Sequence, residues 1–360
     1  MIIPHSRPTI DGKDTISVSK VLTSGRISQG EKVKRFEERL AKFVGVKYGI
    51  AVSSGTSAIH LALRGLDVGV GDEVILPSYV CASPYMAILH AGAKPKLVDV
   101  NISDFNISSI AVKKAVNPKT KAIIVPHMFG TPADLDELQD FGIPIMEDCA
   151  HSLGADYRKR KVGSFGEVSI CSFYATKMLT TGEGGIVLTS DYATYSRVSE
   201  IREYDKKPLD QVRYNYKMSD IQAALGLSQL EKLPYFINRR REIAKIYNDR
   251  FSMNSVKLPS VQPHKNPVFY RYVVLIDKSD LVQKIARKKG IRCEKPVFKP
   301  LSKNFPTVKC PKSDYIYDHA LSIPLYPSLT RPKIDYVTRS LTEILVNSTT
   351  AANPRNDSVV

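Results

Sequence analysis

Short apolar segments alternate with stretches of helical periodicity between residues 48 and 189. Because most of these segments are apolar on both sides, they are expected to be buried on both faces, as parallel strands covered by helices are. The pattern predicts an α/β fold in which a mostly parallel seven-stranded sheet lies between helices. The predicted strands are residues 48–52, 74–76, 95–100, 122–125, 143–146, 168–173 and 186–189.

A smaller unit is predicted after residue 250. The pattern changes there to a strand at 269–276, a helix from Ser279, another strand, a Pro-rich loop and a closing helix near 333–346, which is typical of an α+β domain. The length of 360 residues also favours about two domains. We expect a large α/β domain, including the N-terminal segment, at 1–250, a small α+β domain at 251–346, and a flexible tail at 347–360.

The large domain is predicted to end in helical structure. Ser219-Asp220-Ile221-Gln222 fits a capping box, in which the serine and glutamine side chains bond each other's backbone N–H groups. A helix is expected from there to about Lys232. Pro234 allows a break before a second helix that carries Arg239-Arg240-Arg241.

The chain is basic, with 52 Lys and Arg against 36 Asp and Glu and a formal net charge of +16. Such a charge raises the possibility of a nucleic-acid partner. The excess is scattered and has no interleaved aromatic residues, so we expect no nucleic acid. The same positive charge would also attract an anionic small substrate, such as a sugar nucleotide with its diphosphate.

The sequence shows no secretory signal and no segment with the length and apolar content of a membrane span. Its five cysteines form no Cys-x-x-Cys pair and do not cluster with histidines at zinc spacing. We expect a cytoplasmic protein with no membrane association and no metal site.

Two polar residues follow predicted strands at the positions where a site is expected. Asp148 follows the strand at 143–146, and Lys177 lies just beyond the strand at 168–173; ligands of open α/β sheets bind outside such strand ends. A lysine can form a Schiff base with pyridoxal phosphate (PLP), and a carboxylate can keep the ring nitrogen of PLP protonated. The pair therefore predicts a PLP enzyme with Lys177 and Asp148 as catalytic residues. Glu147 is the alternative carboxylate, but alternation along the strand turns it the other way.

A phosphate site is predicted where the first strand leads into a helix. Ser53-Ser54-Gly55-Thr56-Ser57-Ala58 offers free N–H groups, hydroxyls and a glycine that allows close approach, so Gly55, Thr56 and Ser57 are candidate phosphate ligands. A helix cap without any ligand is the alternative interpretation. His151 either lies near the cofactor ring or is an ordinary loop histidine. The glycines at 182–185 let the backbone beyond Lys177 approach a ligand closely.

Together these residues resemble the DegT family of PLP-dependent, fold-type I nucleotide-sugar aminotransferases. The resemblance covers nearly the whole chain. Its segments are Ser53 to Ala58, Leu76 to Tyr79, Glu147 to Ala155, Ser172 to Gly185, Tyr214 to Leu233 and Leu321 to Ser328, with Gly25 and Gly30 near the start.

The resemblance implies a homodimer with shared active sites, glutamate as amino donor, and a nucleotide-linked keto-sugar of the 3- or 4-keto-6-deoxy type as acceptor. It assigns the Schiff base to Lys177 and the ring nitrogen to Asp148, and it places His151 where the family often has glutamine. It also assigns the phosphate to Thr56, Ser57 and Ser172, with Asn215 reaching the phosphate of the neighbouring subunit.

One position departs from the family. An aromatic residue usually stacks on the cofactor ring at the position of Cys81, which leaves Tyr79 or Tyr85 as candidates for that contact. Two alternative functions are compatible with this fold. The related sugar dehydratases have histidine at the position of Lys177, so the lysine favours amino transfer. A regulatory or nucleic-acid-binding protein with the same fold is supported only by the net charge.

Overall fold

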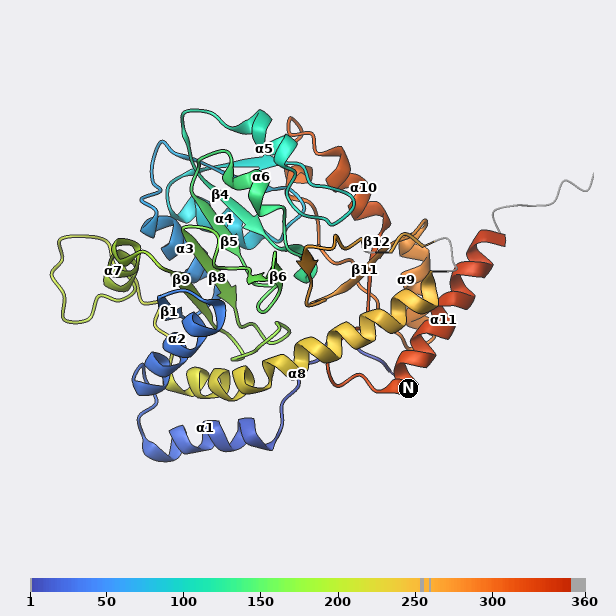
Figure 1. The fold of residues 1–360 in the computed structure, drawn as a ribbon, viewed down its shortest axis with the longest axis horizontal. Helices are drawn as coiled ribbons and strands as arrows, with labels where there is room; N and C mark the ends of the chain where they lie inside the picture. The colour runs from blue at the N-terminus through green and yellow to red at the C-terminus, as the bar shows by residue number, and fades with distance from the viewer. Residues whose placement is uncertain (1, 253–255, 259, 351–360) are drawn as a thin grey trace, which may run out of the picture.

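The computed structural model describes residues 2–252, 256–258 and 260–350 (Figure 1). The seven predicted strands form one sheet, in the order β1-β9-β8-β5-β4-β2-β3. Strand β9 runs antiparallel to both β1 and β8, and the pairs from β8 to β3 are all parallel, so the predicted fold class is confirmed. The strands are β1 (Tyr48–Val52), β2 (Glu73–Pro77), β3 (Lys94–Val98), β4 (Thr120–Pro126), β5 (Ile145–Asp148), β8 (Val168–Ser172) and β9 (Gly185–Thr189).

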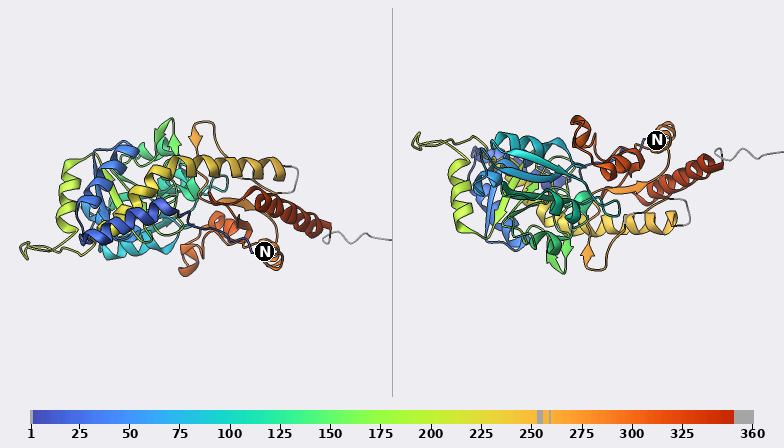
Figure 2. Two further views of the ribbon diagram at one scale, coloured as in Figure 1. Left: turned by 90° about the horizontal axis from the view of Figure 1, so that it is seen from below. Right: turned by 90° about the horizontal axis from the view of Figure 1, so that it is seen from above.

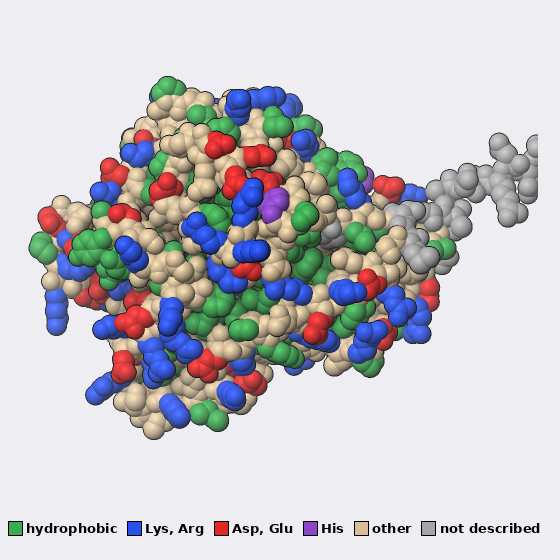
Figure 3. Space-filling model, in the orientation of Figure 1, with side chains coloured by type: hydrophobic (Ala, Val, Ile, Leu, Met, Phe, Trp, Pro, Cys, Tyr) green, Lys and Arg blue, Asp and Glu red, His purple; other side chains and the backbone are tan. Residues whose placement is uncertain are grey.

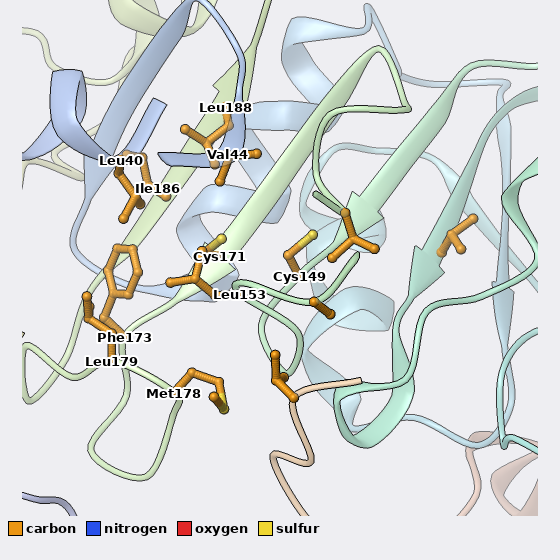
Figure 4. Close-up of a cluster of buried hydrophobic side chains, with 14 of the residues drawn as sticks. Leu40, Val44, Cys149, Leu153, Cys171, Phe173, Met178, Leu179, Ile186 and Leu188 are labelled. Atoms are coloured by element: carbon orange, nitrogen blue, oxygen red, sulfur yellow. The ribbon is translucent and has the colours of Figure 1, made fainter. Parts of the chain in front are cut away.

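Helices cover both faces of this sheet, because successive side chains of a strand point to opposite faces. In β5, Ile145 joins a core with α2, α5, α6 and the first half of α8, while Met146 joins a core with α3, α4 and α7. Figure 4 shows part of the first core, where Leu40 and Val44 of α2 face β8 and β9. The helices are α1 (Gly12–Ser24), α2 (Glu31–Val44), α3 (Gly55–Gly65), α4 (Ala82–His90), α5 (Ser109–Ala115), α6 (Leu135–Gln139), α7 (Tyr192–Ile201) and α8 (Asp220–Phe251).

Helix α8 is continuous, so the prediction of a break at Pro234 is wrong. The capping box at its start is present as predicted. A proline inside a helix costs about 3 kcal/mol, but the helix buries apolar side chains on both sides of Pro234. Leu233 and Ile237 pack in the large-domain core, and Tyr247 packs in the C-terminal core. At about 1.5–3 kcal/mol for each buried side chain, this packing outweighs the proline.

The C-terminal residues build a separate core around a two-stranded antiparallel sheet. Figure 2 shows α8 and α11 extending together from the large sheet. The elements are β11 (Tyr272–Leu275), α9 (Ser279–Lys288), α10 (Pro311–His319), β12 (Ala320–Ile323) and α11 (Arg331–Thr350), with a short 3-10 turn at Leu301–Asn304. Another 3-10 turn, at Met128–Gly130, follows β4 of the large sheet. A domain boundary near residue 250 stays a prediction.

The N-terminal residues differ from the expectation that placed them with the large domain. Ile3 pairs with Ile291 and is fully buried in the C-terminal core, and His5 Nε2 lies 2.8 Å from Ser322 Oγ. Two backbone hydrogen bonds of Ile3, with Gly290 (2.8 Å) and Arg292 (3.0 Å), add to the burial of its side chain in holding this segment there. At the other end, α11 continues to Thr350, past the predicted start of the tail, and residues 351–360 lie outside the described residues.

A small sheet beside the large one was not predicted. Its strands are β6 (Asp156–Tyr157), β7 (Arg160–Lys161) and β10 (Lys265–Asn266). The turn places Arg158 and Lys159 at positive φ, a conformation that their sequence does not signal.

Basic side chains are interspersed with acidic ones on the face of the molecule drawn in Figure 3. No helix within the described ranges combines the length and the hydropathy needed to cross a bilayer.

Candidate active site

Lys177 lies in the loop between β8 and β9, at the carboxyl end of β8. Hydrogen bonds between Phe173 and Gly184 and between Thr181 and Phe173 close this loop at its base. The following residues, Met178 and Leu179, are buried in the core shown in Figure 4. Lys177 itself is half-buried. The loop is thus anchored on both sides of the lysine, which limits where its amine can lie.

Asp148 ends β5, beside β8, and is only 7% exposed. Its Oδ1 accepts a hydrogen bond of 2.9 Å from the N–H of Ala150. Burial raises the pKa of Asp148, while the Ala150 N–H and the charge of Lys177 oppose that rise. A cationic partner would therefore strongly favour the ionised carboxylate. No hydrogen bond to Oδ2 of Asp148 is formed within the described structure, so that oxygen is available for such a partner.

Glu147 points to the opposite face, as the strand alternation predicts. One carboxylate oxygen accepts from the N–H groups of Phe165 (2.7 Å) and Gly166 (2.8 Å), and the other from the N–H of Gly163 (2.7 Å) and from His127 Nε2 (3.0 Å). Burial opposes ionisation of Glu147, but the His127 ring and the N–H donors outweigh it and lower the pKa of Glu147.

This arrangement also bears on metal binding. His127, Glu147 and Cys149 lie close enough together to ligate an ion. However, His127 Nδ1 accepts from the N–H of Ala133 (3.0 Å), and its Nε2 is paired with Glu147. Both ring nitrogens and both carboxylate oxygens are therefore already used in hydrogen bonds within the protein.

The residues predicted to bind a phosphate lie at the start of α3, next to the end of β8. Ser54 caps the helix by accepting from the N–H of Ser57 at 3.0 Å. Gly55 lies so close to β8 that a Cβ atom there would meet Ser172 Cβ at 2.8 Å and Ser172 Oγ at 3.0 Å. The Thr56 hydroxyl lies 2.7 Å from that of Ser83. Because first-turn N–H groups have no acceptor within their helix, this cluster can hold an anion.

His151 lies in a stack of aromatic rings beside Lys177. Its ring is 4.3 Å from that of Tyr270 and 6.1 Å from that of Phe129, with both pairs nearly parallel. The Lys177 amine lies 5.1 Å from the centre of the Tyr270 ring. Burial and then the positive charges of Lys177 and Arg271 lower the pKa of His151, so its ring is neutral near pH 7.

Tyr270, Arg271 and Phe129 were missed by the sequence analysis. Phe129 follows β4, and the other two precede β11, more than 90 residues after Lys177 in the chain. Gly130, at φ +96°, is the one local signal, because a Cβ there would lie 2.9 Å from the backbone nitrogen of Tyr270. The close approach at Gly130 brings the segment after β4, with Phe129, next to the segment before β11, with Tyr270 and Arg271.

The position that the family fills with an aromatic residue lies at the start of α4. Cys81 is solvent-accessible there but crowded by protein, and this partial desolvation, followed by the Asp148 charge, raises its thiol pKa. Tyr79 is fully buried and meets Phe129 edge-on, and Tyr85 stacks on Phe305. Tyr79 therefore has no solvent-accessible ring face, and Tyr85 has one ring face occupied by Phe305; which residue stacks on the cofactor ring stays a prediction.

Asn215 has an exposed side chain between two tyrosines, Tyr214 and Tyr216, whose rings stack on each other at 5.0 Å. The backbone of Tyr216 accepts from the N–H of Ser53, so this segment runs beside the residues predicted to bind a phosphate. Contact of Asn215 with a neighbouring subunit stays a prediction.

The donor set fits PLP. An anchored lysine amine, a buried carboxylate with one oxygen available, and a helix start lined by hydroxyls meet at the carboxyl end of a mostly parallel sheet. These features define a PLP-dependent enzyme of fold type I.

Comparisons with known proteins identify the family. The chain belongs to the DegT/DnrJ/EryC1/StrS aminotransferase family, whose sequence model matches residues 8–342. It is 34% identical to GDP-perosamine synthase from Escherichia coli O157:H7, over 95% of this chain and 98% of that protein. It is 33% identical to the spore coat polysaccharide biosynthesis protein SpsC from Bacillus subtilis, over 95% and 97% of the two chains.

Solved structures give the same result. The putative sugar aminotransferase Spr1654 from Streptococcus pneumoniae, in its PMP form, superposes with a TM-score of 0.92 at 26% identity, over 98% of this chain and all of that one. DesV from S. venezuelae, in complex with a ketimine intermediate, has a TM-score of 0.89 at 30% identity, over 92% and 94% of the two chains. The predictions of this family, of an aminotransferase and of PLP as cofactor are confirmed.

Proposed function

We propose that the protein transfers an amino group from an amino acid, with glutamate as the expected donor, to a nucleotide-linked keto-sugar of the 3- or 4-keto-6-deoxy type. Support comes from relatives whose names connect them to GDP-perosamine and to a spore coat polysaccharide, and from structural neighbours named as sugar aminotransferases. The observation that carries the proposal is the placement of Lys177 beside Asp148 at the sheet edge. A lysine there can accept and return protons, which amino transfer requires.

Each residue of the site has a task in this proposal. When bound, PLP supplies a carbonyl that condenses with amines and a ring that withdraws electrons. Asp148 holds the ring nitrogen in its protonated form, because a buried carboxylate favours a cationic partner. The Lys177 amine holds the cofactor and, once released, moves a proton. The backbone at Gly55 and Thr56 and the hydroxyls of Ser57 and Ser172 bind the phosphate.

The active form is proposed to be a homodimer in which each Asn215 reaches the phosphate in the partner's site. Its exposed side chain leaves Asn215 accessible to a partner subunit, which supports that role. Cross-complementation tests this directly. Lys177→Ala and Asn215→Ala subunits, each impaired alone, should regain activity when mixed, because the mixed dimer contains one site with both residues intact. If mixing restores nothing, the sites are not shared through Asn215.

The substrate is tested by product analysis. The enzyme is incubated with glutamate and a panel of nucleotide-linked 3- and 4-keto-6-deoxy sugars, and each mixture is analysed by mass spectrometry. The expected product carries an amino group in place of the keto oxygen, and Lys177→Ala is the matched inactive control. A product that has lost a hydroxyl without gaining nitrogen would identify a dehydratase, and an unchanged panel would contradict the proposed acceptor class.

A further inference from the structure

Arg271 is a second cation in the site of Lys177. Its guanidinium carbon lies 5.4 Å from the centre of the Tyr270 ring, and the Lys177 amine lies 5.1 Å from the same centre. The charge of Arg271 also acts on His151, whose pKa is lowered first by burial and then by Lys177 and Arg271. The two cations thus share one aromatic neighbour and one histidine.

No carboxylate neutralises Arg271. Within the ranges that the structure describes, it takes part in no ion pair, whereas the similarly half-buried Arg202 pairs with Glu37 at 2.7 Å. The neighbouring group that interacts with the Arg271 side chain is Tyr270, whose phenol is neutral below its pKa of about 8. A guanidinium has five N–H donors, so most of those of Arg271 remain available for an anion.

The backbone that carries Arg271 is fixed from two sides. The N–H of Arg271 donates to Phe129 at 3.4 Å, across the close approach that Gly130 permits. On the other side, the buried Arg240 donates to the carbonyls of Tyr270 (3.0 Å) and Leu325 (3.1 Å). A cation on a backbone held in this way can bind an anion with little loss of conformational entropy.

We propose that Arg271 binds the α-carboxylate of the amino-acid donor while the donor's nitrogen reaches the cofactor held by Lys177. The inference rests on the proposed function, because it takes Lys177 as the attachment point of the cofactor. An amino acid brings a second carboxylate into a site that already contains the buried Asp148 carboxylate, and Arg271 is a cation that can compensate the added charge. Arginine can form two parallel hydrogen bonds with a carboxylate.

The other anion in the proposed reaction is the diphosphate of the sugar nucleotide. It is separated from the reacting keto carbon by part of the sugar ring, whereas the α-carboxylate is bonded to the carbon that carries the reacting amine. The Arg271 guanidinium carbon and the Lys177 amine both lie within 5.4 Å of the centre of the Tyr270 ring. This proximity favours the carboxylate.

The test uses purified holoenzyme and follows the visible band of the lysine-bound cofactor. In the first arm, 2-methylglutamate, which has no α-hydrogen to remove, is titrated into wild type and Arg271→Gln, so that binding is measured without amino transfer. The apparent Kd should rise about 10- to 100-fold in the variant, as expected for the loss of a hydrogen-bonded charge pair. Arg271→Lys should recover part of the affinity.

In the second arm the two half-reactions are measured separately. With glutamate, the concentration for half-maximal rate should rise in Arg271→Gln by a similar factor, with a smaller change in the limiting rate. The half-reaction of the aminated cofactor form with the keto-sugar should keep its wild-type concentration dependence. Arg241→Gln is the matched control, because Arg241 is also half-buried, forms no ion pair within the described residues, and donates to the carbonyl of Pro267 at 2.9 Å.

The outcomes are distinct. Weakened use of the keto-sugar with normal binding of 2-methylglutamate would assign Arg271 to the diphosphate and overturn the inference. Normal behaviour in both arms would overturn it as well. Absence of a visible band in the wild-type holoenzyme, by contrast, would refute the assignment of Lys177 on which the proposed function depends.

Discussion

Glu147→Gln should destabilise the protein strongly, although Glu147 is not predicted to touch the cofactor. Each carboxylate oxygen of Glu147 accepts two hydrogen bonds from buried donors, namely the N–H groups of Gly163, Phe165 and Gly166 and the ring of His127. An amide has one oxygen, so its NH₂ group must face two donors and leave them unsatisfied. Removing one partner of a buried, hydrogen-bonded charge costs about 3–5 kcal/mol.

The assay is urea unfolding of the apoprotein, in which a lower midpoint with an unchanged slope measures the loss of stability. Glu231→Gln is the control, because the pair of Glu231 with Arg39 at 3.0 Å is exposed and should contribute no more than about 1 kcal/mol. Equal midpoints for the two variants would refute the reasoning.

The ionisation of Glu147 should also make the stability of the folded protein depend on pH. Burial opposes the ionised form of Glu147, but the His127 ring and the N–H donors lower its pKa in the folded protein. The ionised Glu147 therefore contributes its full stabilisation at pH values above the pKa that it has in the unfolded chain. This stabilisation is lost as the pH falls through the lower pKa that Glu147 has in the folded protein. Wild type should lose stability on that acid side, and Glu147→Gln should lose less over the same interval.

Three further predictions concern the cofactor site. Gly55→Ala should weaken PLP binding about 5- to 100-fold, since its Cβ would lie 2.8 Å from Ser172 Cβ and an overpacked contact costs about 1–3 kcal/mol; titration of apoprotein with PLP measures this. Burial disfavours ionisation of the Tyr270 phenol, but the charges of Lys177 and Arg271 and nearby hydrogen bonds lower its pKa to about 8. Ultraviolet titration should therefore show a tyrosinate that forms near pH 8, and this signal should be absent in Tyr270→Phe. Asp148→Asn should retain some cofactor but lose most amino transfer, and a near-normal rate would exclude its role at the ring nitrogen.

Matched control variants separate these specific effects from a non-specific loss of folding or stability. Gly12→Ala adds a Cβ with no atom within 4 Å, so PLP binding should be unchanged. Tyr272→Phe removes a phenol that donates to Asn248 at 2.5 Å and whose pKa burial raises, so the titration near pH 8 should persist. An equal loss in variant and control would contradict the corresponding prediction.

The sequence predicts the parts of this molecule that depend on neighbouring residues. The seven strands follow from local apolar runs, and the positions of Asp148 and Lys177 follow from the rule that strand ends carry the site. The capping box at Ser219 is equally local, because its two bonds span four residues.

Features that depend on distant contacts were missed. Tyr270 and Arg271 carry no motif, and only folding brings them beside Lys177. Pro234 is locally a helix breaker, and only the two cores along α8 explain why that helix continues. The full burial of Tyr79 against Phe129 likewise depends on a contact between residues 50 positions apart in the chain.

The central claim is that Lys177 holds the cofactor. The most direct measurement is borohydride reduction of the holoenzyme, followed by proteolysis and mass mapping of the peptides. We expect a cofactor-derived mass on the peptide that contains Lys177, and we expect neither this label nor the visible band in Lys177→Ala. A label on another lysine, or an unchanged visible band in the variant, would contradict this claim.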